Sequence, residues 1–146
     1  MSVGTGFLID INVLSELMRE NPEPQVLAWF SSQPVNLMQT SAVTHSEILT
    51  DIALLPTGKR RQAMALAASQ IFEEDFFGRC FDFGGLAVAQ YALVRAQRQI
   101  AGRPIDTADA QIAAIALAAH LTLVTRNTKD FEGIDGLEVI NPWQPH

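Results

Sequence analysis

The chain has 146 residues, of which 48% are hydrophobic and 18% are charged, so we expect one compact domain over residues 1–146 rather than a disordered segment. Its single cysteine, Cys80, excludes an internal disulfide framework and a cysteine-built metal site. The formal net charge of −6 disfavours a polyanionic ligand unless basic side chains gather locally, and the lack of a membrane-length apolar run or a secretion leader predicts a cytoplasmic protein with no membrane partner.

The first part of the chain predicts short strands that alternate with helices. Residues 6–10 are expected to form a buried strand that ends at Asp10. Asn12 is then expected to cap a short helix. Pro24 suits the first turn of the next helix, and residues 35–39 are expected to form a second strand.

The rest of the chain continues this alternation. Thr44 and Glu47 have the spacing of a capping box, which predicts a helix from there to about residue 55. We then expect a long helix over residues 58–72, a short strand over 80–83 and a second long helix over 84–99. A helix capped by Asp106 or Thr107 should follow over residues 108–119, and two strands over 121–125 and 137–140. Strands that alternate with helices predict a three-layer α/β/α sandwich with a central parallel sheet of about five strands.

Four oxygen-bearing side chains fall at strand ends or helix starts. Asp10 and Asn127 follow predicted strands, whereas Glu47 and Asp109 are expected in the first turns of helices. In an open parallel sheet, ligands gather at the carboxyl ends of the strands. Oxygen ligands from four segments would suit Mg²⁺ or Mn²⁺, and no histidine pair has zinc spacing.

Each of these residues also has a purely structural interpretation. Glu47 could close the capping box, and Asp109 could favour the helix dipole. Asp10 is harder to explain in this way, because a carboxylate beside a buried strand needs a charge partner or a metal. Asn12 could hold that carboxylate, although capping the helix is the preferred interpretation. The scattered histidines and the lack of a glycine-rich loop after the first strand favour neither a catalytic triad nor a nucleotide-binding loop.

The acids and their flanking residues together resemble the sequence pattern of a known protein family. Five stretches of the chain match one family in its own order, and they are Leu8–Leu17, Ser41–Glu47, Asp109–Ala114, Thr125–Phe131 and Asn141–Trp143. Each stretch alone is a weak signal, but five in order span nearly the whole chain. The chain thus resembles the PIN-domain family, and particularly its VapC/FitB-like branch.

The resemblance implies roles for the acids. Asp10, Glu47 and Asp109 correspond to the family's metal-binding acids, and the fourth family position, usually Asp, is Asn127 here. An amide oxygen can ligate Mg²⁺ but brings no charge, so the nearby Asp130 could compensate for it.

The chain departs from the branch at two further positions. Asp51 adds an acid one helical turn beyond Glu47, where the branch often has a small residue. Ile11 replaces a more common Thr and removes a hydroxyl near the site.

The resemblance also implies a function. The implied function is that of the toxin in a type II toxin–antitoxin pair. Such a toxin is an Mg²⁺-dependent endoribonuclease, with Mn²⁺ as an alternative ion. It forms a homodimer and is silenced by a cognate antitoxin. The alternative is a catalytically weak PIN-fold module that binds antitoxin or RNA without efficient cleavage, which the uncharged Asn127 keeps open. A phosphatase is less suitable, because Asp10 is not followed by the Asp-x-Thr that such enzymes carry.

An acidic ribonuclease needs basic side chains near its substrate. Two clusters are candidates: Lys59–Arg61, and the spread Arg95, Arg98 and Arg103. Both could instead be solvated helix faces.

Overall fold

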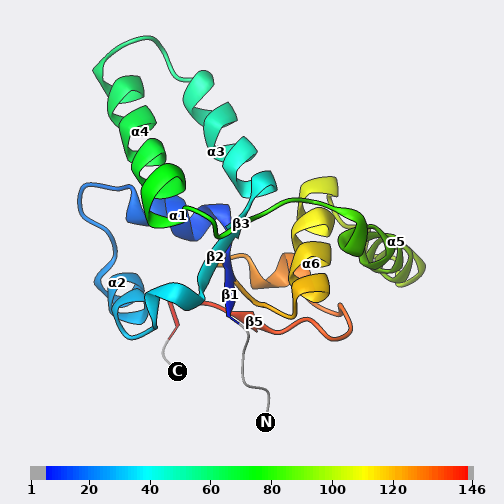
Figure 1. The fold of residues 1–146 in the computed structure, drawn as a ribbon. Coiled ribbons are helices and arrows are strands. Elements are labelled where there is room, and N and C mark those ends of the chain that lie inside the picture. The colour runs from blue at the N-terminus through cyan, green and yellow to red at the C-terminus, as the bar shows by residue number, and fades with distance from the viewer. Residues whose placement is uncertain (1–5, 145–146) are drawn as a thin grey trace.

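One parallel sheet forms the centre of the molecule in the computed structural model, which describes residues 6–144 (Figure 1). Its strands are β1 (Phe7–Ile9), β2 (Met38–Ser41), β3 (Cys80–Phe81), β4 (Thr122–Val124) and β5 (Val139–Ile140). They lie in the order β3-β2-β1-β4-β5, and each neighbouring pair is parallel. The strand order reverses at β1, so the carboxyl end of β1 lies where ligands bind in open parallel sheets.

Helices connect and cover these strands. The α-helices are α1 (Ile11–Leu17), α2 (Pro24–Ser31), α3 (Ala42–Ala53), α4 (Lys59–Ser69), α5 (Gly85–Ile100) and α6 (Thr107–Ala119). Two 3-10 helices, η1 (Val35–Leu37) and η3 (Thr128–Phe131), and a π-helix, η2 (Gln70–Asp75), complete the elements of the described residues. No helix among these residues has the length and apolar character needed to cross a bilayer.

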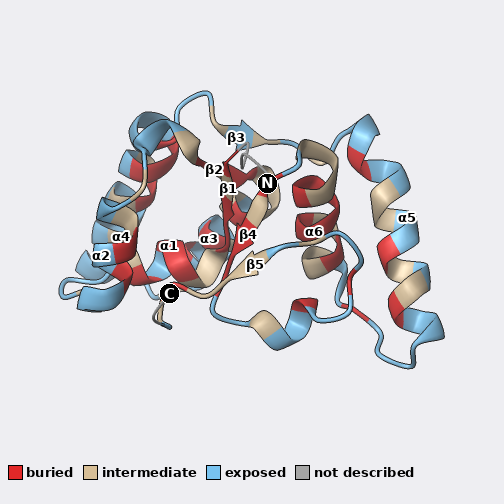
Figure 2. Cartoon of the chain, turned by 90° about the horizontal axis from the view of Figure 1, so that it is seen from below, coloured by how far each residue is buried: buried red, intermediate tan, exposed pale blue. Residues whose placement is uncertain are grey.

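The two faces of the sheet bury different residues, because side chains alternate along a strand. Leu8 and Leu123 point into a core that α5 and α6 cover. Ile9 and Val124, each the next residue along its strand, point into a second core that α1 to α4 cover. The burial colours of Figure 2 show this division, with the buried residues of α6 facing the sheet. The expected three-layer α/β/α sandwich is therefore confirmed.

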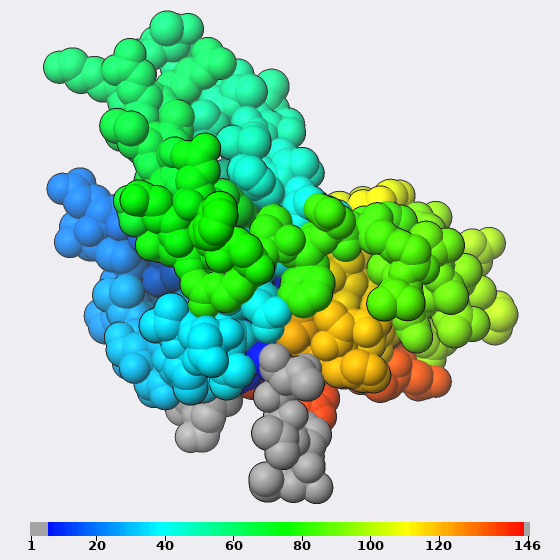
Figure 3. Space-filling model, viewed as in Figure 1, coloured from blue at the N-terminus to red at the C-terminus, as the bar shows by residue number. Residues whose placement is uncertain are grey.

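Helices α3 and α4 form a hairpin that projects from the body as a separate lobe (Figures 1 and 3). Part of the hairpin surface has little to pack against: Leu54, directly after α3, and Leu66, in the second half of α4, are 78% and 74% exposed. Ile48 and Ile52 of α3 instead join the core of the α1 to α4 face. The side of α3 that carries Ile48, the neighbour of Glu47, is thus packed against the core.

Two helix starts differ from the sequence-based expectation. Ser41, not Thr44, caps α3: its hydroxyl accepts a 3.0 Å hydrogen bond from the backbone N–H of Thr44. The helix therefore begins three residues earlier than predicted, and Glu47 lies in its second turn, beyond the reach of a capping box. Asp10, not Asn12, caps α1, because the helix follows β1 without an intervening loop.

The predicted bounds of two other elements differ from the observed ones. Residues 35–37 form η1, and the strand predicted at 35–39 begins only at Met38, after Pro34 has directed the chain into the 3-10 turn. The helix predicted at 58–72 ends as an α-helix at Ser69 and continues as the π-helix η2. That wider turn buries the adjacent Ile71 and Phe72 in the core, which a regular α-helical pattern does not anticipate.

Candidate active site

Asp10 lies between the end of β1 and the start of α1, and the residue is 3% exposed. Its Oδ1 accepts a hydrogen bond of 2.8 Å from the backbone N–H of Ile11, and its Oδ2 accepts one of 2.8 Å from the hydroxyl of Thr125. Burial raises the pKa of Asp10 above its usual value, against the opposing effect of these donors. Asp10 is thus a buried acid with two firm donors and no basic partner among the described residues.

Asn12 connects Asp10 to the loop after β4. Its Nδ2 lies 3.4 Å from Asp10 Oδ2 and donates to the hydroxyl of Thr125 at 3.1 Å. Its Oδ1 accepts a hydrogen bond of 2.9 Å from the backbone N–H of Arg126. The preferred interpretation of Asn12 as a helix cap was therefore wrong, and the other interpretation, that it holds the Asp10 carboxylate, is the one that the contacts support.

Glu47 approaches the same region from α3. Its Oε1 is buried and has no hydrogen-bond partner in the described part of the chain. Burial, followed by the negative charges of Asp10 and Asp109, raises the pKa of Glu47 to about 7. A buried carboxylate oxygen without a donor is unfavourable, so this position is suited to a cation.

Asp109 approaches from the opposite layer, in the first turn of α6. Burial, followed by the charges of Asp10 and Asp106, raises the pKa of Asp109 to about 6. Asp106 caps α6 and lies 3.4 Å from the backbone N–H of Asp109. Because α3 and α6 contact each other, acids from both helical layers meet at the carboxyl edge of the sheet, as the sequence predicted for Asp10, Glu47 and Asp109.

Three other acidic or amide side chains surround this group. Asn127 is exposed after β4, and its backbone N–H, not its side chain, contacts the network, through a hydrogen bond of 3.2 Å to the Thr125 hydroxyl. Asp130 of η3 is near enough for its charge to raise the pKa values of Asp10 and Asp109. Asp51 acts in the same way on Glu47.

Thr125 is a member of the site that the sequence reasoning did not assign. It is fully buried, and its hydroxyl donates to Asp10 while it accepts from Asn12 and from the backbone of Asn127. A signal was present: Thr125 follows the apolar strand β4 as Asp10 follows β1, and polar residues at the ends of neighbouring parallel strands meet at one edge.

The donor set is that of a hard divalent cation. Carboxylates and water are the ligands that Mg²⁺ and Mn²⁺ prefer. The charges of Asp10 and Asp109 raise the pKa of Glu47, and the charge of Asp10 raises the pKa of Asp109. Within residues 6–144 no three acidic, histidine or cysteine side chains form a ready-made cluster. The unpartnered Glu47 oxygen is the single observation of these residues that fits a bound cation.

The predicted basic cluster of Arg95, Arg98 and Arg103 is not a patch for a ligand. Arg98 is 6% exposed and donates to the carbonyls of Arg103 and Asp130, at 2.8 Å each. Arg95 donates to the carbonyl of Ile105, and Arg103 pairs with Glu132. These arginines donate hydrogen bonds to backbone carbonyl groups of the loops around α6. The sequence shows their charges but not these carbonyl partners.

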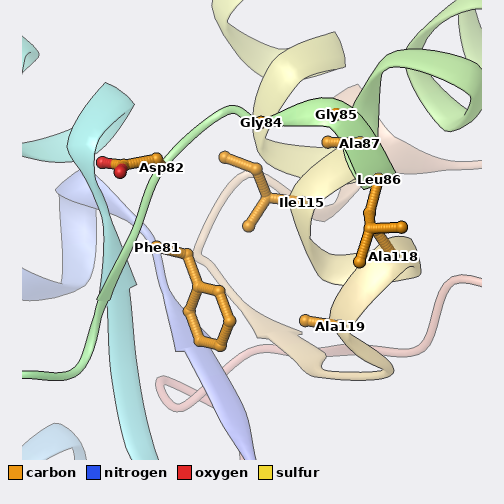
Figure 4. Close-up of a pocket in the computed structure, with 9 residues that line it drawn as sticks. All are labelled: Phe81, Asp82, Gly84, Gly85, Leu86, Ala87, Ile115, Ala118 and Ala119. Atoms are coloured by element: carbon orange, nitrogen blue, oxygen red, sulfur yellow. The ribbon is translucent and has the colours of Figure 1, made fainter.

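A separate pocket of about 310 Å³ lies between α6 and the segment that joins β3 to α5. Figure 4 shows Phe81, Ile115 and Leu86 around it, with the carboxylate of Asp82 directed away. Its lining is apolar, so it has no donors for a phosphate or a metal ion and is not part of the acidic site.

Comparisons with known proteins identify the family of the chain. The PIN domain family matches residues 7–137. The chain is 39% identical to plasmid stability protein StbB of Pseudomonas syringae pv. tomato, over 94% of this chain and 98% of that protein. It is 37% identical to VapC ribonuclease Y4jK of Sinorhizobium fredii, with the same coverage, and 36% identical to toxin FitB of Neisseria gonorrhoeae, over 93% of this chain and 97% of that protein.

The fold is likewise similar to a solved structure of FitAB bound to an IR36 DNA fragment. The TM-score is 0.88 at 34% sequence identity, over 96% of this chain and 97% of that one. The similarity thus extends over nearly the whole of both chains.

Proposed function

Because the chain belongs to the PIN-domain family, in the branch of VapC and FitB, we propose that it is the toxin of a type II toxin–antitoxin pair and a divalent-metal-dependent endoribonuclease. Its substrate is RNA, and its ion is Mg²⁺, with Mn²⁺ as an alternative. The observation that carries this proposal is the approach of Asp10 and Asp109 to Glu47, whose buried Oε1 has no hydrogen-bond partner among the described residues and whose pKa their charges raise further.

In this proposal Asp10, Glu47 and Asp109 have different roles. Asp10 and Asp109 hold the ion, which when bound neutralises phosphate charge and supplies an activated water. Glu47 would orient that water through Oε1, which is buried and has no hydrogen-bond partner among the described residues. Thr125 and Asn12 keep Asp10 in place through their hydrogen bonds. Asn127 is the fourth site position, where its amide brings a ligand oxygen without a charge.

The partners follow from the same proposal. The similarity to FitAB supports a cognate antitoxin, whose basic side chains would pair with the site acids, since a guanidinium binds carboxylates in bidentate fashion. We propose a homodimer as the toxin's own assembly and the cytoplasm, where its RNA lies, as its location.

The alternative of a catalytically weak binding module has less support. It rested on the uncharged Asn127, whereas Asp130 already brings a charge near Asp10 and Asp109. A single assay separates the two: total RNA is incubated with the protein, with and without Mg²⁺, and a chromogenic phosphoester serves as a second substrate. The proposal expects cleavage of RNA only with the ion and no action on the phosphoester. RNA left intact at every Mg²⁺ concentration would support the binding module instead.

A further inference from the structure

Few of the basic side chains of this acidic protein are available to a ligand. The chain has ten lysines and arginines. Five arginines already bind carbonyl or carboxylate groups of the protein, and they are Arg19, Arg79, Arg95, Arg98 and Arg103. Lys59, Arg60 and Arg61 lie at the start of α4, on the projecting hairpin. Arg126 and Lys129, in the segment after β4, are the remaining two.

Arg126 is the basic residue that is tied directly to the acidic site. It follows Thr125, which binds Asp10, and its own backbone N–H donates to Asn12 Oδ1 at 2.9 Å. The residue is exposed, and within the described residues its guanidinium makes no hydrogen bond to a carbonyl or carboxylate. Its backbone is thus fixed beside the site. Its cation is near enough to Glu16 to lower the pKa of that carboxyl, but it forms no ion pair among the described residues and stays exposed to a ligand.

The indole of Trp143 determines where this cation lies. The Arg126 guanidinium lies over the Trp143 ring, 4.8 Å from the ring centroid. The backbone N–H of Trp143 donates to Asn141 Oδ1 at 2.9 Å, directly after β5. Because β5 pairs with β4, the sheet itself brings this ring to the residue that follows Thr125.

We propose that Arg126, held by Trp143, binds an RNA phosphate next to the one that is cleaved. The inference rests on the proposed ribonuclease function and names its substrate-binding group. A guanidinium that lies over a ring keeps its N–H edge free, and that edge binds phosphate oxygens in bidentate fashion. A protein with a net charge of −6 needs such a cation beside its acids to hold a polyanion.

RNA fits this position better than an antitoxin does. A basic antitoxin side chain that enters the acidic group meets like charge at Arg126, whereas a phosphate meets opposite charge. Trp143 acts on the RNA only through Arg126, because its ring lies under the guanidinium. Trp143 is therefore a positioning residue, and Arg126 is the binding residue.

The test measures RNA binding without cleavage. A fluorescein-labelled single-stranded RNA is titrated with the Asp109→Asn protein, alone and combined with Arg126→Ala. The alanine retains the backbone N–H that Asn12 binds, so the Asp10 network is preserved. The matched control is Arg103→Ala, which removes the same charge from a side chain already paired with Glu132.

We expect Arg126→Ala to weaken RNA binding by about tenfold, which corresponds to about 1.4 kcal/mol. The slope of log K against log salt concentration should fall by about 0.7, the value for one lost phosphate contact on a single strand. Arg103→Ala should change neither quantity. Equal effects of the two variants, or no effect of Arg126→Ala, would overturn the inference, as would a loss of antitoxin binding with RNA binding intact.

The role of Trp143 has its own readout in the protein with all its acids. Trp143→Leu should raise KM for RNA with little change in kcat, and Trp143→Phe, which keeps a ring under the guanidinium, should restore KM. An equal fall of kcat in both variants would contradict a positioning role. If the wild-type protein cleaves no RNA at all, the proposed function fails, and the binding titration still decides whether Arg126 holds RNA.

Discussion

The hydroxyl of Thr125 donates a hydrogen bond of 2.8 Å to Oδ2 of Asp10, across 115 positions of the sequence. Both residues are buried, and each follows a central strand of the sheet. This hydrogen bond fixes the orientation of the Asp10 carboxylate from the neighbouring strand. We therefore expect Thr125→Val to lower the free energy of unfolding by about 2 kcal/mol, the contribution of a hydrogen bond to a charged group.

The same substitution should also reduce RNA cleavage, because Asp10 loses its orienting donor. Chemical denaturation and a cleavage assay measure the two effects. Thr125→Ser, which keeps the hydroxyl, is the control and should restore most of both. A serine variant as defective as the valine variant would show that the methyl group of Thr125, not its hydroxyl, is what matters.

Asp10→Asn and Asp109→Asn should each abolish RNA cleavage while the protein stays folded. The reason is that affinity for Mg²⁺ depends on carboxylate charge, and the amide keeps the shape of the side chain. Circular dichroism checks the fold, and Asp135→Asn, an exposed acid on the loop before β5, is the matched control. Folded variants that still cut RNA would remove these two residues from the metal site.

Asn127→Asp should increase affinity for Mg²⁺ or the rate of cleavage, because it adds a charge at the fourth site position. Isothermal titration with Mg²⁺ measures the first effect and a cleavage time course the second. If neither changes, Asp130 already supplies the missing charge, and the double variant Asn127→Asp, Asp130→Asn should then behave like the wild-type protein.

The stability of the metal-free protein should decrease as pH rises from about 4.5 to about 7. The pKa values of Glu47 and Asp109, at about 7 and about 6, lie above their usual 4.5 and 3.8. The folded state therefore holds its protons more tightly than the unfolded state, and it loses this advantage as the pH passes through the folded pKa values. Saturating Mg²⁺ should reverse the trend, and thermal melts across this pH range measure both. A metal-free Tm that rises over the range would contradict the raised pKa values.

A small, relatively basic antitoxin should purify together with this chain when the adjacent reading frame is expressed with it. Titration with Mn²⁺ should then release the partner, because ion and antitoxin compete for the same acids. Size-exclusion chromatography follows both steps. A monomeric chain that retains no neighbouring product would count against the toxin assignment and leave the nuclease fold unaffected.

The fold could be predicted from the sequence because its strands and helices carry local signals. The apolar strand before Asp10 and the alanine-rich helix after Asp106 are both where the sequence placed them. The helix caps were less predictable, since Ser41 and Thr44 are both good capping residues. Which of them caps α3 depends on where β2 ends, and that is set by the pairing of β2 with β1 and β3.

The site was only partly predictable for a similar reason. Its acids stand at strand ends and near helix starts, which the sequence reveals. The contacts of Asn12 with Arg126 and of Thr125 with Asp10 join segments more than a hundred residues apart. No local pattern encodes such contacts. The burial of Arg98 is a further example, because its carbonyl partners come from two loops that only the folded sheet brings together.

The pairing of β1 with β4 also has a consequence for synthesis of the protein. During synthesis Asp10 leaves the ribosome 115 residues before Thr125 does. Until β4 emerges, the central strand has one edge unpaired and Asp10 lacks its hydroxyl donor. Non-local strand pairs form late for this reason. We therefore expect that a nascent chain has no assembled acidic site until β4 has emerged and paired with β1.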